Sequence, residues 1–191
     1  GGLPPRRASA AVDFSVQKCV WPVVPRLPRR CGAESLANQA LVGVPGVEMG
    51  PYGTLAVDVT RLDPEAPVTT DLLTDNFVGF RAFTELAPQL GVDGRTFKWQ
   101  VVGPVTLGLT LLRAGAPDHL AFRVATQAIN EHVATLGSVL AEVLPNSMQL
   151  IVFDEPLMVD LMSNDFPLAP DAVADMLSGA VSYTHLRAHE T

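Results

Sequence analysis

The sequence of residues 150–156, LIVFDEP, places two adjacent carboxylates, Asp154 and Glu155, directly after an apolar run of strand length. Consecutive side chains on a strand point to opposite sides. One carboxylate should therefore face a pocket at the end of the strand, and the other should anchor the neighbouring loop or helix. A carboxylate in such a place can bind a substrate ammonium group, accept a proton or orient an arginine. A capping Asp followed by a solvated Glu explains the same residues equally well.

A second strand end carries residues that could surround a ligand. In residues 101–106, VVGPVT, Gly103 permits a tight turn close to a ligand and Pro104 stops the strand. Thr106 can cap a following helix, whose N-terminal amides could hold an anion. On residue types alone, an ordinary turn between a strand and a helix is the simpler explanation.

These two strand ends belong to a pattern of alternating strands and helices. That order is typical of a parallel sheet with crossover helices. In parallel α/β barrels the active site forms at the carboxyl ends of the strands. The expected strands are residues 96–102 and 148–153, and the expected helices are residues 8–18, 34–42, 71–90, 105–114, 120–144 and a last one from 171 onward.

The composition argues against several classes of function. The 191 residues suit one domain, and 48% hydrophobic with 17% charged residues suits an α/β body whose strands are covered on both faces. The net charge of −7 and the pI of 4.9 argue against nucleic acid as a partner, because phosphate binding needs a basic face. The basic cluster Arg26, Arg29 and Arg30 is expected to be a solvated loop. No apolar run reaches the roughly 18 residues of a membrane span, so no membrane partner is expected.

The cysteines and histidines give little support for a disulfide or a metal site. Cys19 and Cys31 flank a proline-rich loop without the spacing of a metal or redox motif, so a reducing cytoplasm is the expected setting. His119 and His132 fall within helical stretches and are expected to be surface or interhelix residues. No phosphate-binding loop, nucleophile elbow or dinucleotide fingerprint is found in the sequence.

The last eleven residues, 181–191, have an artificial character. Their sequence, VSYTHLRAHET, is the in-frame translation of a transposase mosaic-end sequencing adapter. Such segments are set aside before reasoning about a fold. We therefore expect a natural segment of residues 1–180, followed by a tail that extends the last helix without packing or is disordered.

The motifs GPVT at residues 103–106 and DEP at residues 154–156 resemble those of the superfamily of cobalamin-independent methionine synthase and uroporphyrinogen decarboxylase. The resemblance runs over most of residues 1–180 and includes WPVVPRLPRR at residues 21–30 and YGTLAVD at residues 52–58. It implies an incomplete (β/α)8 TIM barrel with parallel strands, of which this chain would hold about five of eight units. Methionine biosynthesis in the cytoplasm is the setting that the resemblance implies.

The resemblance also implies substrate-binding roles. In methionine synthases the Asp of DEP binds the amino group of homocysteine, which implies that role for Asp154. That family's Gly-Ser turn touches the same amino acid and corresponds here to Gly1 and Gly2, so one side-chain contact is lost. The other candidates for this substrate site are Glu155, Gly103, Pro104 and Thr106.

The folate site of the synthases is matched only in part. An acidic folate contact of that family corresponds to Asp160. Leu55 and Ala56 stand where the synthases carry an Arg-Cys pair, and Thr110 stands where they carry a Trp. A folate methyl donor would therefore keep the contact at Asp160 but lack the Arg-Cys pair and the Trp.

The family's zinc ligands lie on strands after DEP. The resemblance thus implies zinc in the intact parent protein and no metal ligand in this fragment. Zinc would hold the substrate thiol as a thiolate, which is the effective nucleophile. The implied function is methyl transfer to a small thiol such as homocysteine, with the fragment itself inactive.

Three alternatives stay open. A decarboxylase of the uroporphyrinogen type needs no metal and uses an acidic residue together with arginines for the substrate carboxylates. A corrinoid-linked methyltransferase would need a corrinoid protein as its partner. A barrel that binds a small ligand without turnover is the third.

Overall fold

The computed structural model describes residues 7–27, 32–50, 54–163 and 165–187, with only the backbone described for Asp160 and for residues 181–187. The helices are α1 (Ala8–Lys18), α2 (Leu36–Ala40), α3 (Val78–Leu86), α4 (Pro104–Arg113), α5 (Asp118–Val143) and α6 (Pro170–Arg187). The strands are β1 (Val47–Met49), β2 (Leu55–Val57), β3 (Phe97–Val102) and β4 (Gln149–Asp154). Short 3-10 helices are η1 (Gly32–Glu34), η3 (Val59–Arg61), η4 (Asp75–Phe77) and η5 (Pro156–Asp160).

The expectation of a five-unit parallel barrel is wrong. In the described part of the chain the strands form two sheets of two strands each, β3 beside β4 and β1 beside β2. The β1–β2 pair is an antiparallel hairpin of three-residue strands, which no βα unit of a parallel barrel contains. The stretch between this hairpin and α3 consists of turns and 3-10 helices, so it adds no parallel strand.

The proline-rich segment, residues 21–27, explains in part why the β3–β4 sheet has fewer strands than the barrel expectation requires. Val23 forms a single parallel bridge with Lys98 of β3, flanked by a backbone bond from Val24 N to the Lys98 carbonyl at 2.9 Å. Pro22 and Pro25 have no N–H to donate, so the segment cannot continue as a regular strand in a sheet. The segment therefore lies along the edge of β3 without becoming a third strand.

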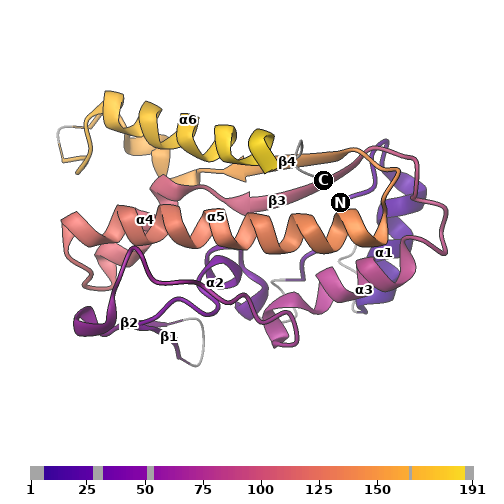
Figure 1. The fold of residues 1–191 in the computed structure, drawn as a ribbon, viewed down its shortest axis with the longest axis horizontal. Helices are drawn as coiled ribbons and strands as arrows, with labels where there is room; N and C mark the ends of the chain where they lie inside the picture. Colours follow the sequence, from indigo (N-terminus) through magenta and orange to yellow (C-terminus); the bar gives the residue numbers. More distant parts are fainter. Residues whose placement is uncertain (1–6, 28–31, 51–53, 164, 188–191) are drawn as a thin grey trace.

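The local unit β3–α4–α5–β4 agrees with the sequence pattern. β3 and β4 pair in parallel along their whole length, from Phe97 opposite Gln149 to Val102 opposite Asp154. Figure 1 shows these two strands side by side, with α5 and α6 running along them. The crossover runs through two helices in succession, and α6 packs against both α4 and α5.

Alternation along β3 gives the sheet two different faces. Trp99 and Val101 are buried, and Trp99 lies against Gly137 of α5. Lys98 and Gln100 point to the other side and are half-buried. Polar side chains can therefore gather on the face that turns away from α5.

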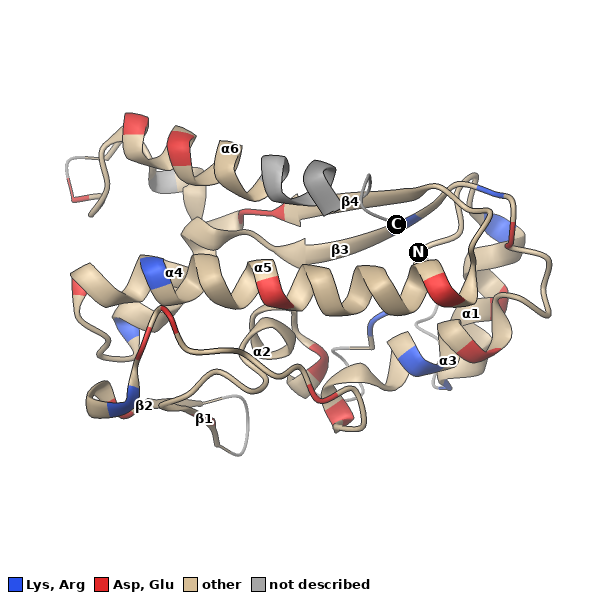
Figure 2. Ribbon diagram, viewed as in Figure 1, with Lys and Arg blue, Asp and Glu red and all other residues tan. Residues whose placement is uncertain are grey.

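The charged residues do not form a continuous basic surface in the described elements. Figure 2 shows Lys and Arg interspersed with Asp and Glu along the ribbon. The exclusion of nucleic acid stays a prediction from the net charge. Among the described residues, no helix combines the length and the apolar character needed to cross a membrane.

Gly79 allows a close approach between α3 and the proline-rich segment. A Cβ atom at this position would overlap the Pro25 carbonyl and would lie 3.1 Å from Oε2 of Glu34. We expect Gly79→Ala to lower the free energy of unfolding by about 2 kcal/mol or more, because a backbone carbonyl cannot rotate aside as a side chain can. Urea unfolding followed by circular dichroism measures this change.

The matched control for this prediction is Gly179→Ala in α6. Gly179 is exposed, and a Cβ there would have nothing within 4 Å. This change should be neutral or stabilising by up to about 1 kcal/mol, because alanine favours the helix over glycine. Equal effects of the two substitutions would show that the contact with Pro25 has no energetic weight.

Candidate functional site

The two strand ends that the sequence singles out meet at one edge of the β3–β4 sheet. Val102 lies opposite Asp154 in the parallel register, and Gly103 N donates to the Asp154 carbonyl at 2.8 Å. The turn at Pro104 and the carboxylates before Pro156 are therefore neighbours. Their proximity is what a site at the carboxyl ends of parallel strands requires.

Glu155 closes the N-terminus of α4. Its carboxylate accepts hydrogen bonds from Val105 N at 2.9 Å and from Thr106 N at 2.6 Å. These amides belong to the first turn of the helix, which has no internal partner for them and favours negative charge. The anion expected at this helix N-terminus is therefore supplied by the chain itself.

The hydrogen bonds of Glu155 to α4 require a residue without a side chain at Gly103. A Cβ atom at this position would overlap the carboxyl group of Glu155. Gly103 is also the N-cap residue of α4, and it has no side chain with which to cap the helix. Thr106, which the sequence suggested as the cap, instead accepts a hydrogen bond from Leu157 N on its hydroxyl at 3.2 Å. We call the contact of Glu155 with Val105 N and Thr106 N the Glu155 clamp.

Four of the residues predicted to bind substrate make structural contacts at the N-terminus of α4. Gly103, Pro104, Thr106 and Glu155 hold α4 against η5, so their hydrogen-bonding groups are engaged within the chain. Pro104 occupies the first turn of α4, where a missing N–H costs nothing. These four residues therefore build the wall of the strand edge, and their role in substrate binding stays a prediction.

Asp154 points away from the Glu155 clamp. Its Oδ2 accepts a hydrogen bond from Nε2 of Gln100 at 3.2 Å, across the sheet on the half-buried face of β3. This divergence of two consecutive carboxylates follows from the alternation of side chains along an extended chain. Of the two, Asp154 is the one whose described partner is a side-chain amide, whereas Glu155 is bound by backbone amides of α4.

Arg26 binds Gln100, the residue that also binds Asp154. This contact corrects the expectation that Arg26 lies in a solvated loop. Its Nη2 donates to Oε1 of Gln100 at 3.2 Å, and the side chain is half-buried. The bridge between Val23 and Lys98 explains this position, because it holds the segment beside β3. Arg29 and Arg30 lie outside the described residues.

The charge of Arg26 is affected by its surroundings. Burial lowers the pKa of the guanidinium from its usual value, while the negative charges of Asp154 and Glu34 act in the opposite direction. Glu34 is fully buried, and its Oε2 accepts from Leu27 N at 2.8 Å. The backbone on both sides of Arg26 is thereby fixed, by Glu34 on one side and by β3 on the other.

Sequence reasoning missed Gln100 and Glu34. The signal for Gln100 was a polar side chain in the apolar strand FKWQVV, at a position that alternation assigns to the side opposite Trp99. Glu34 gave no comparable signal, since an isolated Glu before a short helix is ordinarily exposed. We name Arg26, Gln100 and Asp154 the polar triad.

A small cavity lies next to the polar triad. Its volume is about 20 Å³, which leaves room for about one water molecule. The side chains around it are mostly aromatic or aliphatic. Its lining residues include Arg26, Gln39, Phe77, Phe80, Trp99 and Gln100.

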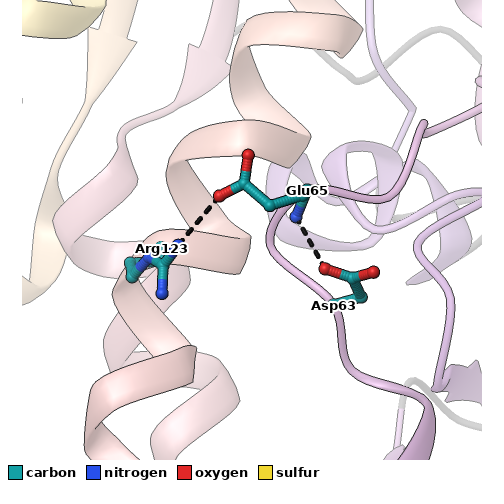
Figure 3. Close-up of polar contacts among 3 residues, drawn as sticks. All are labelled: Asp63, Glu65 and Arg123. Carbon is teal, nitrogen blue, oxygen red and sulfur yellow. Dashed lines mark hydrogen bonds and ion pairs between the residues drawn. The ribbon is translucent and has the colours of Figure 1, made fainter.

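A larger groove lies elsewhere, between α5, α6 and the loop before η4. It has a volume of about 340 Å³ and contains no residue of the polar triad or of the Glu155 clamp. Arg123 and Glu65 form an ion pair at its border at 2.8 Å, and Glu65 N donates to Asp63 at 2.9 Å (Figure 3). Both partners of the ion pair are well exposed, so the pair adds little stability.

His132 is a buried base in α5. Its Nδ1 has no hydrogen-bond partner among the described residues, and its ring lies 5.7 Å from the ring of Phe77. Burial lowers the pKa of this imidazole to about 4. His132 thus occupies the interhelix position that the sequence suggested, whereas His119 is exposed at the start of α5.

The described residues do not provide a zinc site. Within them, no three His, Cys, Asp or Glu side chains lie close enough together to hold a metal ion. Gly1 and Gly2 lie outside the described residues. Asp160 ends η5, and only its backbone is described. No chemical step is therefore assigned to a metal here.

The comparisons with known proteins add no relative. No protein-family model, no curated protein and no solved structure matches this chain. Its function must therefore be inferred from the polar triad and from the strand edge that carries it.

Proposed function

We propose that this chain binds the amino group of a small thiol-bearing amino acid at Asp154. It would do so as the substrate-binding part of a methyltransferase that acts on a thiol such as homocysteine. The observation that supports the proposal is the position of Asp154. It ends β4 at the same edge as the turn at Gly103, points away from the Glu155 clamp, and has the side-chain amide of Gln100 as its described partner.

The chemistry of an ammonium group fits that position. A carboxylate accepts charge-assisted hydrogen bonds from an ammonium, and these are roughly twice as strong as bonds between neutral groups. The contribution assigned to this chain is to bind and orient the substrate. Methyl transfer also needs the thiol as a thiolate, and none of the described residues is assigned that task.

A decarboxylase of the uroporphyrinogen type is the second candidate. The observation that favours it is Arg26, which lies in the same polar triad as Asp154. That chemistry combines an acidic residue with arginines that bind the substrate carboxylates. In this case a pyrrole bearing several carboxylates would bind in place of an amino acid.

Replacing Asp154 by Asn tests the proposed function. We expect Asp154→Asn to weaken the binding of L-homocysteine by about tenfold or more, because the charge-assisted bond to the ammonium is lost. Isothermal titration calorimetry on the full chain under reducing conditions measures the affinity. Asp13→Asn, which removes an exposed carboxylate of α1, is the matched control and should bind as the natural chain does.

Two results would count against the proposal. Equal affinity of the Asp154→Asn and Asp13→Asn proteins would remove Asp154 from the site. Binding of a pyrrole tetracarboxylate without any binding of L-homocysteine would favour the decarboxylase.

A further inference from the structure

The Gln100 amide lies between a cation and an anion. Its Oε1 accepts from Arg26 Nη2 at 3.2 Å, and its Nε2 donates to Asp154 Oδ2 at 3.2 Å. Among the described residues, the ion pair found joins Arg123 to Glu65, and none joins Arg26 to a carboxylate. The amide thus gives each charged group one neutral hydrogen-bond partner.

An α-amino acid presents the same two functions in the same order. Its ammonium group donates and its carboxylate accepts, and the two are separated by about 3 Å through one carbon atom. An amide is a neutral version of that arrangement. Because both groups of the zwitterion are ionised, its bonds to Asp154 and Arg26 would be stronger than those of the amide.

We propose that Arg26 binds the carboxylate of the amino acid whose amino group Asp154 binds, and that the Gln100 amide is a neutral placeholder which the ligand displaces. This inference rests on the proposed function, because it assigns the second end of the same ligand. Arg26 is then the residue that selects amino acids against simple amines. The site would then bind ligands that carry both an ammonium group and a carboxylate.

The backbone around Arg26 supports such a role. Val24 N donates to the Lys98 carbonyl at 2.9 Å, and Leu27 N donates to buried Glu34 at 2.8 Å. These bonds hold the chain on both sides of the arginine before any ligand arrives. A side chain that is already positioned loses less conformational entropy on binding.

The burial of Arg26 adds a reason for it to bind an anion. A guanidinium has five N–H donors, and the bond to Gln100 uses Nη2. Burial lowers the pKa of this group, which means that the charged form is incompletely compensated in the free protein. A ligand carboxylate would supply that compensation, and a fork-shaped guanidinium is well matched to it.

The test compares two ligands on three proteins. The ligands are L-homocysteine and its decarboxylated analogue, an aminopropanethiol, and the proteins are the natural full chain, Arg26→Gln and Arg123→Gln. We expect the natural chain to prefer homocysteine by about tenfold or more, and Arg26→Gln to reduce that ratio to about one. Arg123→Gln removes a distant exposed guanidinium and should keep the natural ratio.

A second variant keeps Arg26 in place. Gln100→Glu puts a carboxylate beside the guanidinium, where it would pair with Arg26 and compete with the ligand. We expect this protein to lose the preference for homocysteine as Arg26→Gln does. If Arg26→Gln proves unfolded by circular dichroism, Gln100→Glu decides the question.

The outcomes separate the two proposals. An unchanged preference in a folded Arg26→Gln or Gln100→Glu protein would overturn the role of Arg26 and leave the proposed function standing. If the natural chain binds both ligands equally well, the inference fails while Asp154 keeps its role as the amine site. If the natural chain binds neither ligand, the proposed function fails, and the assignment of Arg26 fails with it.

Discussion

Replacing Glu155 by alanine is expected to lower the free energy of unfolding by about 3 kcal/mol. The substitution removes the acceptor of Val105 N and Thr106 N, and both residues are buried. A buried donor left without a partner loses the hydration that it had in the unfolded chain, and the α4 dipole loses its counter-charge. Urea unfolding at neutral pH measures the effect.

Two further variants test the explanation for the Glu155 effect. Glu142→Ala removes an exposed carboxylate of α5 and should change stability little. Gly103→Ala should be strongly destabilising in the natural chain and much less so in the Glu155→Ala background, because the group that its Cβ would overlap is then gone. Strict additivity of the two changes would contradict the Glu155 clamp.

The stability of the protein is expected to fall by about 3 kcal/mol through His132 alone as the pH decreases from neutral to about 4. The imidazole has an ordinary pKa of 6.5 when unfolded, and burial lowers its pKa in the folded protein to about 4. The unfolded chain therefore binds the proton first as the pH falls. The stabilisation is complete above pH 6.5 and is lost progressively down to the folded pKa.

The contribution of His132 must be separated from that of the carboxylates. The Thr60 side chain lowers the pKa of Asp58, and the Asn146 side chain lowers the pKa of Asp93, so both carboxylates also lose stabilisation in acid. His132→Leu should flatten the pH dependence of the unfolding free energy between neutrality and pH 4. A constant difference in unfolding free energy between the natural chain and His132→Leu at every pH would refute the assignment.

Local signals predicted the regular elements around the candidate site well. Apolar periodicity and the flanking prolines and glycines indicated α1, α5 and the two parallel strands to within about two residues. Such signals act within a few residues of the chain, so they need no knowledge of distant partners. The parallel pairing of β3 with β4 followed from the order of these elements.

Local hydrogen bonds overrode the apolar periodicity at residues 71–90, which were predicted as one helix. Asp71 accepts from Leu73 N at 2.9 Å, and this turn is followed by the 3-10 helix η4 before α3 begins at Val78. Leu73, an apolar residue within the range predicted as helix, is 83% exposed. The turn closed by the Asp71 side chain is followed by η4, and α3 therefore begins at Val78, about two turns later than predicted.

The sequence by itself determined that Asp154 and Glu155 diverge at the end of a strand, because alternation is a property of the extended backbone. Only the tertiary structure decided that Glu155 caps α4, that Asp154 faces Gln100, and that Arg26 binds Gln100 from 74 residues away. Tertiary packing also decided the number of strands in the described part of the chain, which is too small for the barrel that was expected. Contacts between distant residues depend on how whole elements pack, and no pattern within a short stretch of sequence encodes that packing.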